Sequence, residues 1–372
     1  MSDGGLRVVV SGGGTGGHIY PALAIARGVL ARGGTVLYAG TAAGMESSIV
    51  PREGIPFAGI ASAGLSRSWS VRNLAALGRA GWGVAQACGV LRRFRPRVVA
   101  GTGGYVSAPV VLAAAAMRIP TLIHEQNAVP GLTNRSLSRL ADGVAVTFPA
   151  ALDRFPGRRV KYTGLPVRPE FLAADRAAAR RRLGLAGDVF FLLSVGGSRG
   201  AHSLNMGMVD VIRALGGQKD LELVHLTGQA GRPAFQAELD RRGIILANYG
   251  NVRVEAYRDD MADLMAAADL VIARAGAASI AELTVLGRPS ILVPYPFAAA
   301  NHQQVNAEEL VARGAARMIL DRDLSGACLV ENIGDLRRDP GARERMARAA
   351  LELGRPRALE DILDFIERLA FS

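Results

Sequence analysis

The chain is poor in cysteine and has no long apolar run. Its two cysteines, Cys88 and Cys328, are far apart and lie between small or apolar neighbours. A disulfide framework needs more thiols, so both are expected to fill core positions in a reducing compartment. The most apolar stretch, Val106 to Met117, is shorter than the roughly 20 residues that span a bilayer. Because no signal-peptide pattern opens the chain either, we expect a cytosolic protein that spans no membrane.

Acidic residues are also missing from a long segment. No Asp or Glu lies between Gly54 and His124, whereas eight arginines do. Residues 1–164 hold eighteen Lys and Arg against six Asp and Glu, so they account for the whole net charge of +11. Such a basic region indicates a polyanionic partner, either nucleic acid or an anionic membrane surface. An arginine-biased proteome that uses arginine for solubility would produce the same composition.

The 372 residues exceed what one core usually supports, and two series of short apolar segments alternate with helical patterns. This rhythm predicts two doubly wound α/β domains, each with a parallel sheet covered on both faces. We expect the first domain over 1–164 and the second over 165–354, with a last helix at about 355–372 crossing back to the first. The expected strands are Leu6–Ser11, Thr35–Ala39, Val98–Ala100, Thr121–His124 and Val144–Thr147, then Val189–Val195, Leu221–Thr227, Val252–Glu255, Leu270–Ala273, Ser290–Val293 and Arg317–Leu320.

A glycine-rich loop follows the first expected strand. Gly12, Gly14 and Gly17 match the dinucleotide pattern G-x-G-x-x-G, but the second strand ends in Tyr38-Ala39-Gly40-Thr41, without the acid that binds the ribose. NAD binding is therefore not expected. Glycines at the start of a helix still allow backbone N–H groups to face an anion or a sugar.

Three further loops have the same placement after a strand. They are Gly101-Thr102-Gly103-Gly104-Tyr105, Gly196-Gly197-Ser198-Arg199-Gly200, and Arg274 to Glu282. Any one of them could be only a tight turn between a strand and a helix. Four such loops in two domains favour a ligand cleft.

A series of motifs makes a resemblance specific. The chain resembles the bacterial undecaprenyldiphospho-muramoylpentapeptide β-N-acetylglucosaminyltransferases over essentially its full length, through Gly13-Gly14-Thr15-Gly16-Gly17-His18, Gly103-Gly104-Tyr105-Val106-Ser107, His124-Glu125-Gln126-Asn127, Gly131-Leu132-Thr133-Asn134, Gly196 to Ala201, Gly276 to Glu282 and Gln303 to Ala307. It departs from the family at Leu165, usually Asn, and at Ala278-Ser279-Ile280, usually a Leu-Thr-Val-like run. These departures bear on the donor contacts.

The resemblance implies the GT-B fold, with two Rossmann-like domains facing across a cleft. It also implies an inverting transfer of N-acetylglucosamine from UDP to the C4 hydroxyl of the muramoyl residue in lipid I. That reaction gives lipid II and UDP in peptidoglycan synthesis, at the cytoplasmic face of the cell membrane. The implied partners are UDP-N-acetylglucosamine, lipid I and the anionic inner-membrane surface, with no nucleic acid.

The second domain offers groups that suit a UDP-sugar. Ser198 and nearby N–H groups would meet a phosphate oxygen, the helix that starts at Ala277, Ala278 and Ser279 would face the diphosphate, and Glu282 would accept the ribose hydroxyls. An alternative is that Glu282 pairs with an arginine such as Arg288. The family match adds further donor-site residues, namely Arg168, the backbone of Tyr257, Gln303 and Gln304, with Thr15, Gly16, Gly17 and Asn127 from the first domain.

Attack by a hydroxyl needs a general base, and histidine has the suitable pKa. Among five histidines, His18 alone ends a glycine loop of the first domain. It could instead merely cap the following helix. His124 and Glu125 are the second choice, on an acceptor side that also includes Gly104 and Tyr105.

No cofactor is expected. Asp321-Arg322-Asp323 imitates the D-x-D metal motif, but its position between a late strand and a helix favours a cap and a solvated turn. In the acid-free segment, Arg79, Trp82 and Arg93 recur at helical spacing and suit a phospholipid interface; alternatively Trp82 packs under a loop.

Two other functions remain open. One is an enzyme resembling UDP-N-acetylglucosamine 2-epimerase, which would leave the basic segment unexplained. The other is a binding protein for nucleotide sugars or nucleic acid, without catalysis.

Overall fold

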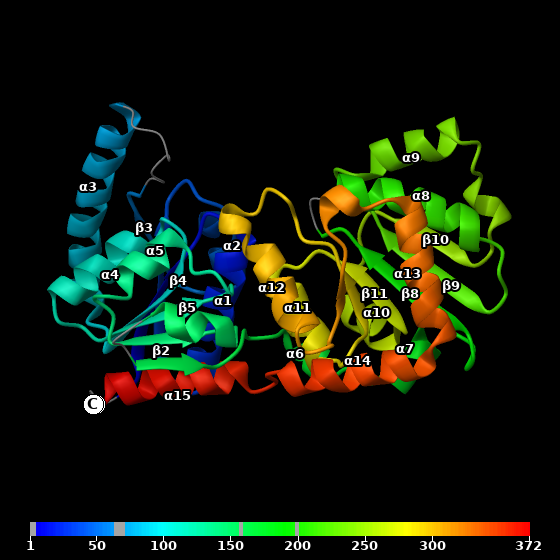
Figure 1. The fold of residues 1–372 in the computed structure, drawn as a ribbon. Helices are drawn as coiled ribbons and strands as arrows, with labels where there is room; N and C mark the ends of the chain where they lie inside the picture. The colour runs from blue at the N-terminus through cyan, green and yellow to red at the C-terminus, as the bar shows by residue number, and fades with distance from the viewer. Residues whose placement is uncertain (1–4, 63–70, 156–158, 198–200) are drawn as a thin grey trace. The chain divides into compact units, whose positions relative to one another are not determined.

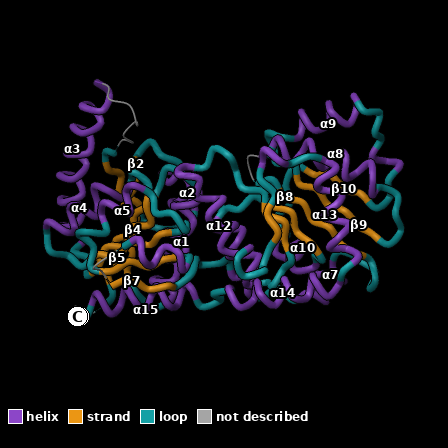
Figure 2. Tube along the Cα trace, in the orientation of Figure 1, coloured by secondary structure: helices purple, strands orange, loops and turns teal. Residues whose placement is uncertain are grey.

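The computed structural model describes residues 5–62, 71–155, 159–197 and 201–372, with the backbone alone at 71–77 and 80. Its contacts divide the chain into two compact units. The first comprises Met1–Pro166 together with Pro356–Ser372, and the second is Val167–Arg355. Each unit has its own strands enclosed by helices (Figure 2).

The first unit contains a seven-stranded parallel sheet in the order β3-β2-β1-β4-β5-β6-β7. Its strands are β1 (Arg7–Gly12), β2 (Thr35–Thr41), β3 (Phe57–Ile60), β4 (Val98–Gly103), β5 (Thr121–Glu125), β6 (Gly143–Val146) and β7 (Arg159–Tyr162). Its helices are α1 (Gly16–Ala31), α2 (Glu46–Arg52), α3 (Val71–Phe94), α4 (Ser107–Ala116), α5 (Leu132–Leu137) and α15 (Ala358–Ala370). Alternation along β1 sends Val8 and Val10 into one core cluster and Val9 into another, so both faces of the sheet are buried.

The second unit contains a six-stranded parallel sheet in the order β10-β9-β8-β11-β12-β13. Its strands are β8 (Phe190–Val195), β9 (Leu221–Leu226), β10 (Val252–Glu255), β11 (Leu270–Ala273), β12 (Ser290–Leu292) and β13 (Arg317–Met318). Its helices are α6 (Pro169–Leu172), α7 (Arg176–Arg182), α8 (His202–Leu215), α9 (Arg232–Arg241), α10 (Met261–Ala267), α11 (Ala277–Val285), α12 (His302–Val311), α13 (Gly326–Arg338) and α14 (Pro340–Leu353).

The prediction of two doubly wound parallel sheets is confirmed, and every expected strand segment forms a strand. Two strands were not predicted. They are β3 and β7, which form the two edges of the first sheet. Edge strands are covered on fewer sides, and both are only partly buried, so they lack the continuous apolar run that marks a central strand.

The last helix, α15, packs against α1 in the first unit (Figure 1). It buries Ile362, Leu363 and Ile366 in the same cluster as Val8 and Val10. Gly28 of α1 makes the close approach possible, because a Cβ there would lie 2.7 Å from Leu363 Cδ1. The apolar face expected for this helix therefore completes the core of the first unit.

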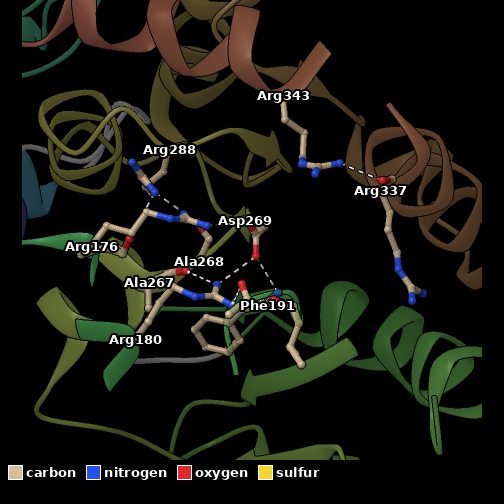
Figure 3. Close-up of polar contacts among 12 residues, drawn as sticks. Arg176, Arg180, Phe191, Ala267, Ala268, Asp269, Arg288, Arg337 and Arg343 are labelled. Carbon is tan, nitrogen blue, oxygen red and sulfur yellow. Dashed lines mark hydrogen bonds and ion pairs between the residues drawn. The ribbon is translucent and has the colours of Figure 1, made fainter. Parts of the chain in front are cut away.

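Arginines hold the carboxyl end of α10 in the second unit (Figure 3). Arg288 donates to the carbonyl of Ala266 at 3.1 Å, and Arg180 and Arg176 donate to the next two carbonyls at 3.2 and 2.8 Å. Asp269 pairs with Arg176 and Arg180. Burial lowers the pKa of Arg288 to about 10. Guanidinium groups thus satisfy carbonyls that have no partner at the end of a helix, where the dipole also favours positive charge.

Candidate functional site

The carboxyl ends of β1 and β4 place two glycine loops in contact. The N–H of Gly13 donates to the carbonyl of Gly103 at 3.4 Å. A Cβ on Gly104 would lie 2.2 Å from the carbonyl oxygen of Gly13, and Gly104 has φ +75°. Both the close approach and the left-handed backbone require glycine at this position.

His18 lies in the first turn of α1, and its ring reaches the neighbouring strands instead of capping its own helix. Its Nδ1 lies 3.0 Å from the carbonyl oxygen of Thr102 at the end of β4 and 2.9 Å from Oε1 of Gln126, which follows β5. The Thr102 hydroxyl donates to the carbonyl of His18 at 2.8 Å. The side chain that sequence reasoning selected as a base is therefore held through Nδ1, and Nε2 is the nitrogen left for chemistry.

The two second-choice residues are buried inside the first unit, each about 1% exposed. His124 places Nε2 3.0 Å from the carbonyl of Gly164, and burial lowers its pKa to about 4. Glu125 accepts from the N–H groups of Asn127 and Gly131 at 3.0 and 3.2 Å. It also accepts from Asn134 Nδ2 at 2.9 Å. These contacts organise the loop after β5 and engage both nitrogens of His124 and both oxygens of Glu125.

Sequence reasoning missed Glu46, a fully buried carboxylate behind the first glycine loop. It accepts from the N–H of Thr41 at 3.0 Å and from the N–H of Gly14 at 3.4 Å, and also from the Thr41 hydroxyl. Cβ atoms on Gly13, Gly40 or Gly44 would all lie within 3 Å of its side chain. Glu46 is the first acidic residue after Asp3. A single acidic residue within an apolar and glycine-rich region is the sequence pattern that could have identified it as a buried carboxylate.

The remaining first-unit residues surround the start of α1. Thr15 and Gly17 are exposed, Gly16 is partly buried, and Thr15 makes no side-chain cap, so the first N–H groups of the helix face outward. Tyr105 is 38% exposed and its ring approaches Gly14. Asn127 is partly buried beside Glu125. A helix start of this kind favours an anionic or hydroxyl-bearing ligand.

In the second unit, α11 begins at Ala277 directly after β11. Gly276 precedes it with an extended backbone and no side-chain cap, and Ile280 is the first residue whose N–H bonds back to Gly276. Ala278 is exposed, and Ala277 and Ser279 are partly buried. The expected helix start for a diphosphate is therefore present. Ser198 lies outside the described residues.

Glu282 lies further along α11 and pairs with Arg168. Arg168 Nη2 is 3.1 Å from Glu282 Oε1. Burial raises the pKa of Glu282, and the Arg168 charge opposes this increase. Glu282 therefore does pair with an arginine, as the alternative expected. The partner is Arg168 and not Arg288, which donates to backbone carbonyls. The second unit thus brings together Glu282, expected at the ribose from its place on the helix, and Arg168, which the family match adds to the donor site.

Three other donor-site candidates lie on loops of the second unit. Tyr257 is 54% exposed, on a loop braced by the ion pair between Arg258 and Asp260. Gln303 Oε1 accepts the N–H of Tyr295 at 2.9 Å. Gln304 Nε2 donates to Glu308 at 2.8 Å. Backbone and neighbouring side chains therefore fix the direction of both amides.

The interpretation of Asp321 as a helix cap in a solvated turn is wrong. Asp321 accepts from Arg274 and from the Ser203 hydroxyl, and it is largely buried, whereas Ser325 caps α13. Asp323 does face solvent. Over the described part of the chain, no group of three or more His, Cys, Asp and Glu side chains has the arrangement of a metal site.

The basic helix α3 exposes the residues expected at a phospholipid interface. Trp82 is 63% exposed, and Arg79 and Arg93 are exposed on the same helix. Trp82 is therefore not packed under a loop. Among the described residues, no helix is both long and apolar enough to cross a bilayer.

Comparisons with known proteins agree along the whole chain. Residues 8–146 match the glycosyltransferase family 28 N-terminal domain and residues 191–363 match the family 28 C-terminal domain. A UDP-N-acetylglucosamine–N-acetylmuramyl-(pentapeptide) pyrophosphoryl-undecaprenol N-acetylglucosamine transferase of Desulforudis audaxviator is 55% identical, covering 98% of this chain and 99% of the relative. The crystal structure of MurG from Acinetobacter baumannii aligns with a TM-score of 0.81 at 32% identity, over 98% of this chain and 99% of that one. A UDP-GlcNAc 2-epimerase from Neisseria meningitidis, 14% identical with a TM-score of 0.67 over 98% and 100% of the two chains, shares the fold alone.

Proposed function

Because the chain belongs to the family of UDP-N-acetylglucosamine–N-acetylmuramyl-(pentapeptide) pyrophosphoryl-undecaprenol N-acetylglucosamine transferases, we propose that it converts lipid I to lipid II. N-acetylglucosamine moves from UDP to the C4 hydroxyl of the muramoyl residue, and UDP is released. The observation that carries this proposal is the 55% identity to such a transferase over 98% of the chain. The chain is a glycosyltransferase, and its product belongs to peptidoglycan synthesis.

The first unit supplies the acceptor side and the base. The C4 hydroxyl gives its proton to Nε2 of His18 as its oxygen attacks the anomeric carbon, and the bond to UDP breaks with inversion. The positive charge that develops on His18 is stabilised by the two oxygens beside Nδ1, on Thr102 and Gln126. His124 and Glu125 support the loop after β5, and Gly104 and Tyr105 line the acceptor side.

The second unit holds the donor. The N–H groups of Ala277, Ala278 and Ser279 face the diphosphate and stabilise the charge that UDP gains as it leaves. Glu282 binds the ribose hydroxyls beside Arg168, and the backbone of Tyr257 meets the uracil edge. Gln303 and Gln304 contact the sugar, and Ser198 meets a phosphate oxygen. Thr15, Gly16, Gly17 and Asn127 complete the donor contacts from the first unit.

The protein works at the cytoplasmic face of the membrane as a peripheral enzyme. The acceptor carries an undecaprenyl chain, so the enzyme must reach a bilayer surface. Arg79, Trp82 and Arg93 on α3 provide two cations and an exposed aromatic ring for an anionic lipid surface.

UDP release tests the proposal. UDP-N-acetylglucosamine is incubated with the protein, with and without a lipid I analogue, and UDP and the sugar products are measured. Release of UDP that depends on the analogue, with formation of the disaccharide, is expected. Conversion to the 2-epimer without any acceptor would favour the epimerase, and binding of UDP without turnover would favour a non-catalytic protein.

A further inference from the structure

The ring of His18 faces two oxygens at one nitrogen. Its Nδ1 lies 3.0 Å from the Thr102 carbonyl and 2.9 Å from Gln126 Oε1. A carbonyl oxygen only accepts hydrogen bonds, so Nδ1 must carry the proton if Gln126 presents its oxygen to the ring. The Thr102 carbonyl already favours a proton on Nδ1. The Gln126 amide reinforces that tautomer if its oxygen faces the ring and opposes it if its NH₂ group does.

Backbone carbonyls determine that orientation. Gln126 is 3% exposed, and its Nε2 lies 2.8 Å from the carbonyl oxygen of Thr102 and 2.9 Å from that of His124. Rotating the amide by half a turn would bring its oxygen against both carbonyls and its NH₂ group against the ring. Such a rotation would exchange two hydrogen bonds for close contacts between oxygen atoms, which repel each other because a carbonyl oxygen has no proton to donate. The oxygen of Gln126 therefore faces His18.

His124 is compatible with the same arrangement. Its Nε2 lies 3.0 Å from the carbonyl of Gly164 and therefore carries a proton, which leaves Nδ1 as an acceptor 3.1 Å from Gln126 Nε2. Burial lowers the pKa of His124 to about 4, so this ring is neutral around pH 7. No group in contact with Gln126 therefore competes for the orientation of its amide.

We propose that Gln126 is a positioning residue that fixes His18 in the tautomer protonated at Nδ1, which leaves the lone pair of Nε2 available as the base. Gln126 acts through His18 and does not itself touch the substrate. The catalytic consequence rests on the proposed function, whereas the tautomer itself is a property of the protein without ligand. The order β1-β4-β5 in the first sheet brings the three participants together. Thr102 and Gln126 lie at or just beyond the ends of β4 and β5, and His18 lies in the first turn of α1, the helix that follows β1.

The test is nuclear magnetic resonance on protein labelled with ¹⁵N-histidine, without substrate, at about pH 8, where neutral imidazole prevails for an ordinary histidine. Long-range ¹H–¹⁵N correlations report which ring nitrogen is protonated, and a His18→Gln spectrum assigns the signals. Protonation at Nδ1 is expected in the unmodified protein. Protonation at Nε2 would overturn the proposal.

Two variants test whether Gln126 is responsible. Gln126→Met removes the acceptor at similar volume, so His18 is expected to populate the Nε2-protonated tautomer. The kcat should then fall by about 10- to 100-fold with little change in the KM for UDP-N-acetylglucosamine. Gln126→Glu still presents one oxygen to Nδ1 and should retain the Nδ1 tautomer. It should also lose stability, because its second oxygen replaces the NH₂ group that donates to the Thr102 and His124 carbonyls. An unchanged tautomer in Gln126→Met would assign the role to the Thr102 carbonyl alone and overturn the proposal.

Thr121→Val is the matched control. Thr121 is buried at the other end of β5, and its hydroxyl lies 3.2 Å from Asp142. This variant should lose stability without changing the tautomer. If Gln126→Met and Gln126→Glu both lose stability and kcat equally while the tautomer stays at Nδ1, Gln126 has only a structural role. Because the spectra need no substrate, a failure of the transfer reaction itself would be seen separately, in the assay of the unmodified protein.

Discussion

Arg168 and Glu282 form an ion pair that uses only one oxygen of the carboxylate. Nη2 and Nε of Arg168 lie 3.1 and 3.3 Å from Oε1 of Glu282. Among the described residues, none is in hydrogen-bond contact with Oε2. Arg168 also lies over the ring of Phe171, with its guanidinium carbon 4.5 Å from the ring centroid, which restricts its position. A carboxylate held at one oxygen retains the other for a ligand.

The first prediction follows for the donor ribose. Glu282→Gln should weaken UDP binding by about 10- to 100-fold, because a pair of hydrogen bonds to a charged acceptor is lost. Binding of 2′,3′-dideoxy-UDP, which lacks both hydroxyls, should barely change. Calorimetric titration of the two nucleotides measures the difference. Equal losses for both, together with a lower melting temperature, would mean that Glu282 supports the fold instead of the ribose.

The second prediction concerns the base. His18→Ala should lower kcat by about 10²- to 10⁴-fold, because proton transfer from the attacking hydroxyl loses its acceptor. The Kd for UDP should be nearly unchanged. Single-turnover kinetics with a lipid I analogue measure the effect. Turnover close to that of the unmodified protein would mean that His18 is not the base. His124 would not replace it, since both of its nitrogens are already engaged inside the unit.

The third prediction concerns the lipid surface on α3. A protein with Arg79→Gln, Trp82→Ala and Arg93→Gln should bind anionic vesicles at least about 30-fold more weakly, because each arginine near such a surface contributes about 1 kcal/mol and the ring adds apolar contact. Vesicle sedimentation at two salt concentrations measures this, with UDP binding as the check on folding.

A control for this surface removes the same kinds of side chain from the second unit. Arg241, Arg345 and Leu351 are exposed there. A protein with Arg241→Gln, Arg345→Gln and Leu351→Ala should keep its vesicle affinity. Equal weakening in both proteins would indicate a general effect of net charge, and no weakening in the α3 variant would remove the surface from the proposal.

The fourth prediction concerns the buried carboxylate of Glu46. Glu46→Gln replaces one acceptor oxygen by an NH₂ group, which then faces the N–H donor of either Thr41 or Gly14, so the free energy of unfolding should fall by about 1.5–3 kcal/mol. The kcat should fall as well, because the glycine loop carries His18. Glu53→Gln is the control, since Glu53 pairs with Arg27 at the surface, where ion pairs contribute about 0–1 kcal/mol. If both changes lowered the free energy of unfolding by urea equally, the buried contacts of Glu46 with the glycine loop would not be what stabilises the fold.

The fifth prediction is a loss of stability in acid. His225 is fully buried, and desolvation lowers its pKa to about 3 in the folded protein, against about 6.5 when unfolded. Between these values the unfolded chain binds more protons, so the stability of the second unit falls as the pH decreases from about 6.5 to 3. Between pH 7 and 4.5 this group should account for about 2–3 kcal/mol. Urea unfolding of His225→Asn should show a correspondingly shallower pH dependence, and an unchanged slope would mean that other groups determine it.

The sequence alone determined the central architecture and the identity of the candidate groups. Continuous apolar runs such as Val189–Val195 predict strands because a strand buried on both faces needs apolar side chains at every position. The edge strands β3 and β7 were not predicted, because each is only partly buried and therefore lacks a continuous apolar run. The glycine loops directly after strands could also be recognised from the sequence, because a close approach of two backbones requires glycine whatever residues surround it.

The tertiary structure decided which partner each group has. His18 and His124 both lie in motifs that carry the family resemblance. One contacts Thr102 and Gln126 through Nδ1, whereas the other has both nitrogens engaged. Glu282 pairs with Arg168, which lies 114 residues away, and not with the nearby Arg288. A sequence pattern shows which face of a single helix or strand is buried. The hydrogen-bond partner of a side chain depends instead on which distant strands and helices the fold places side by side.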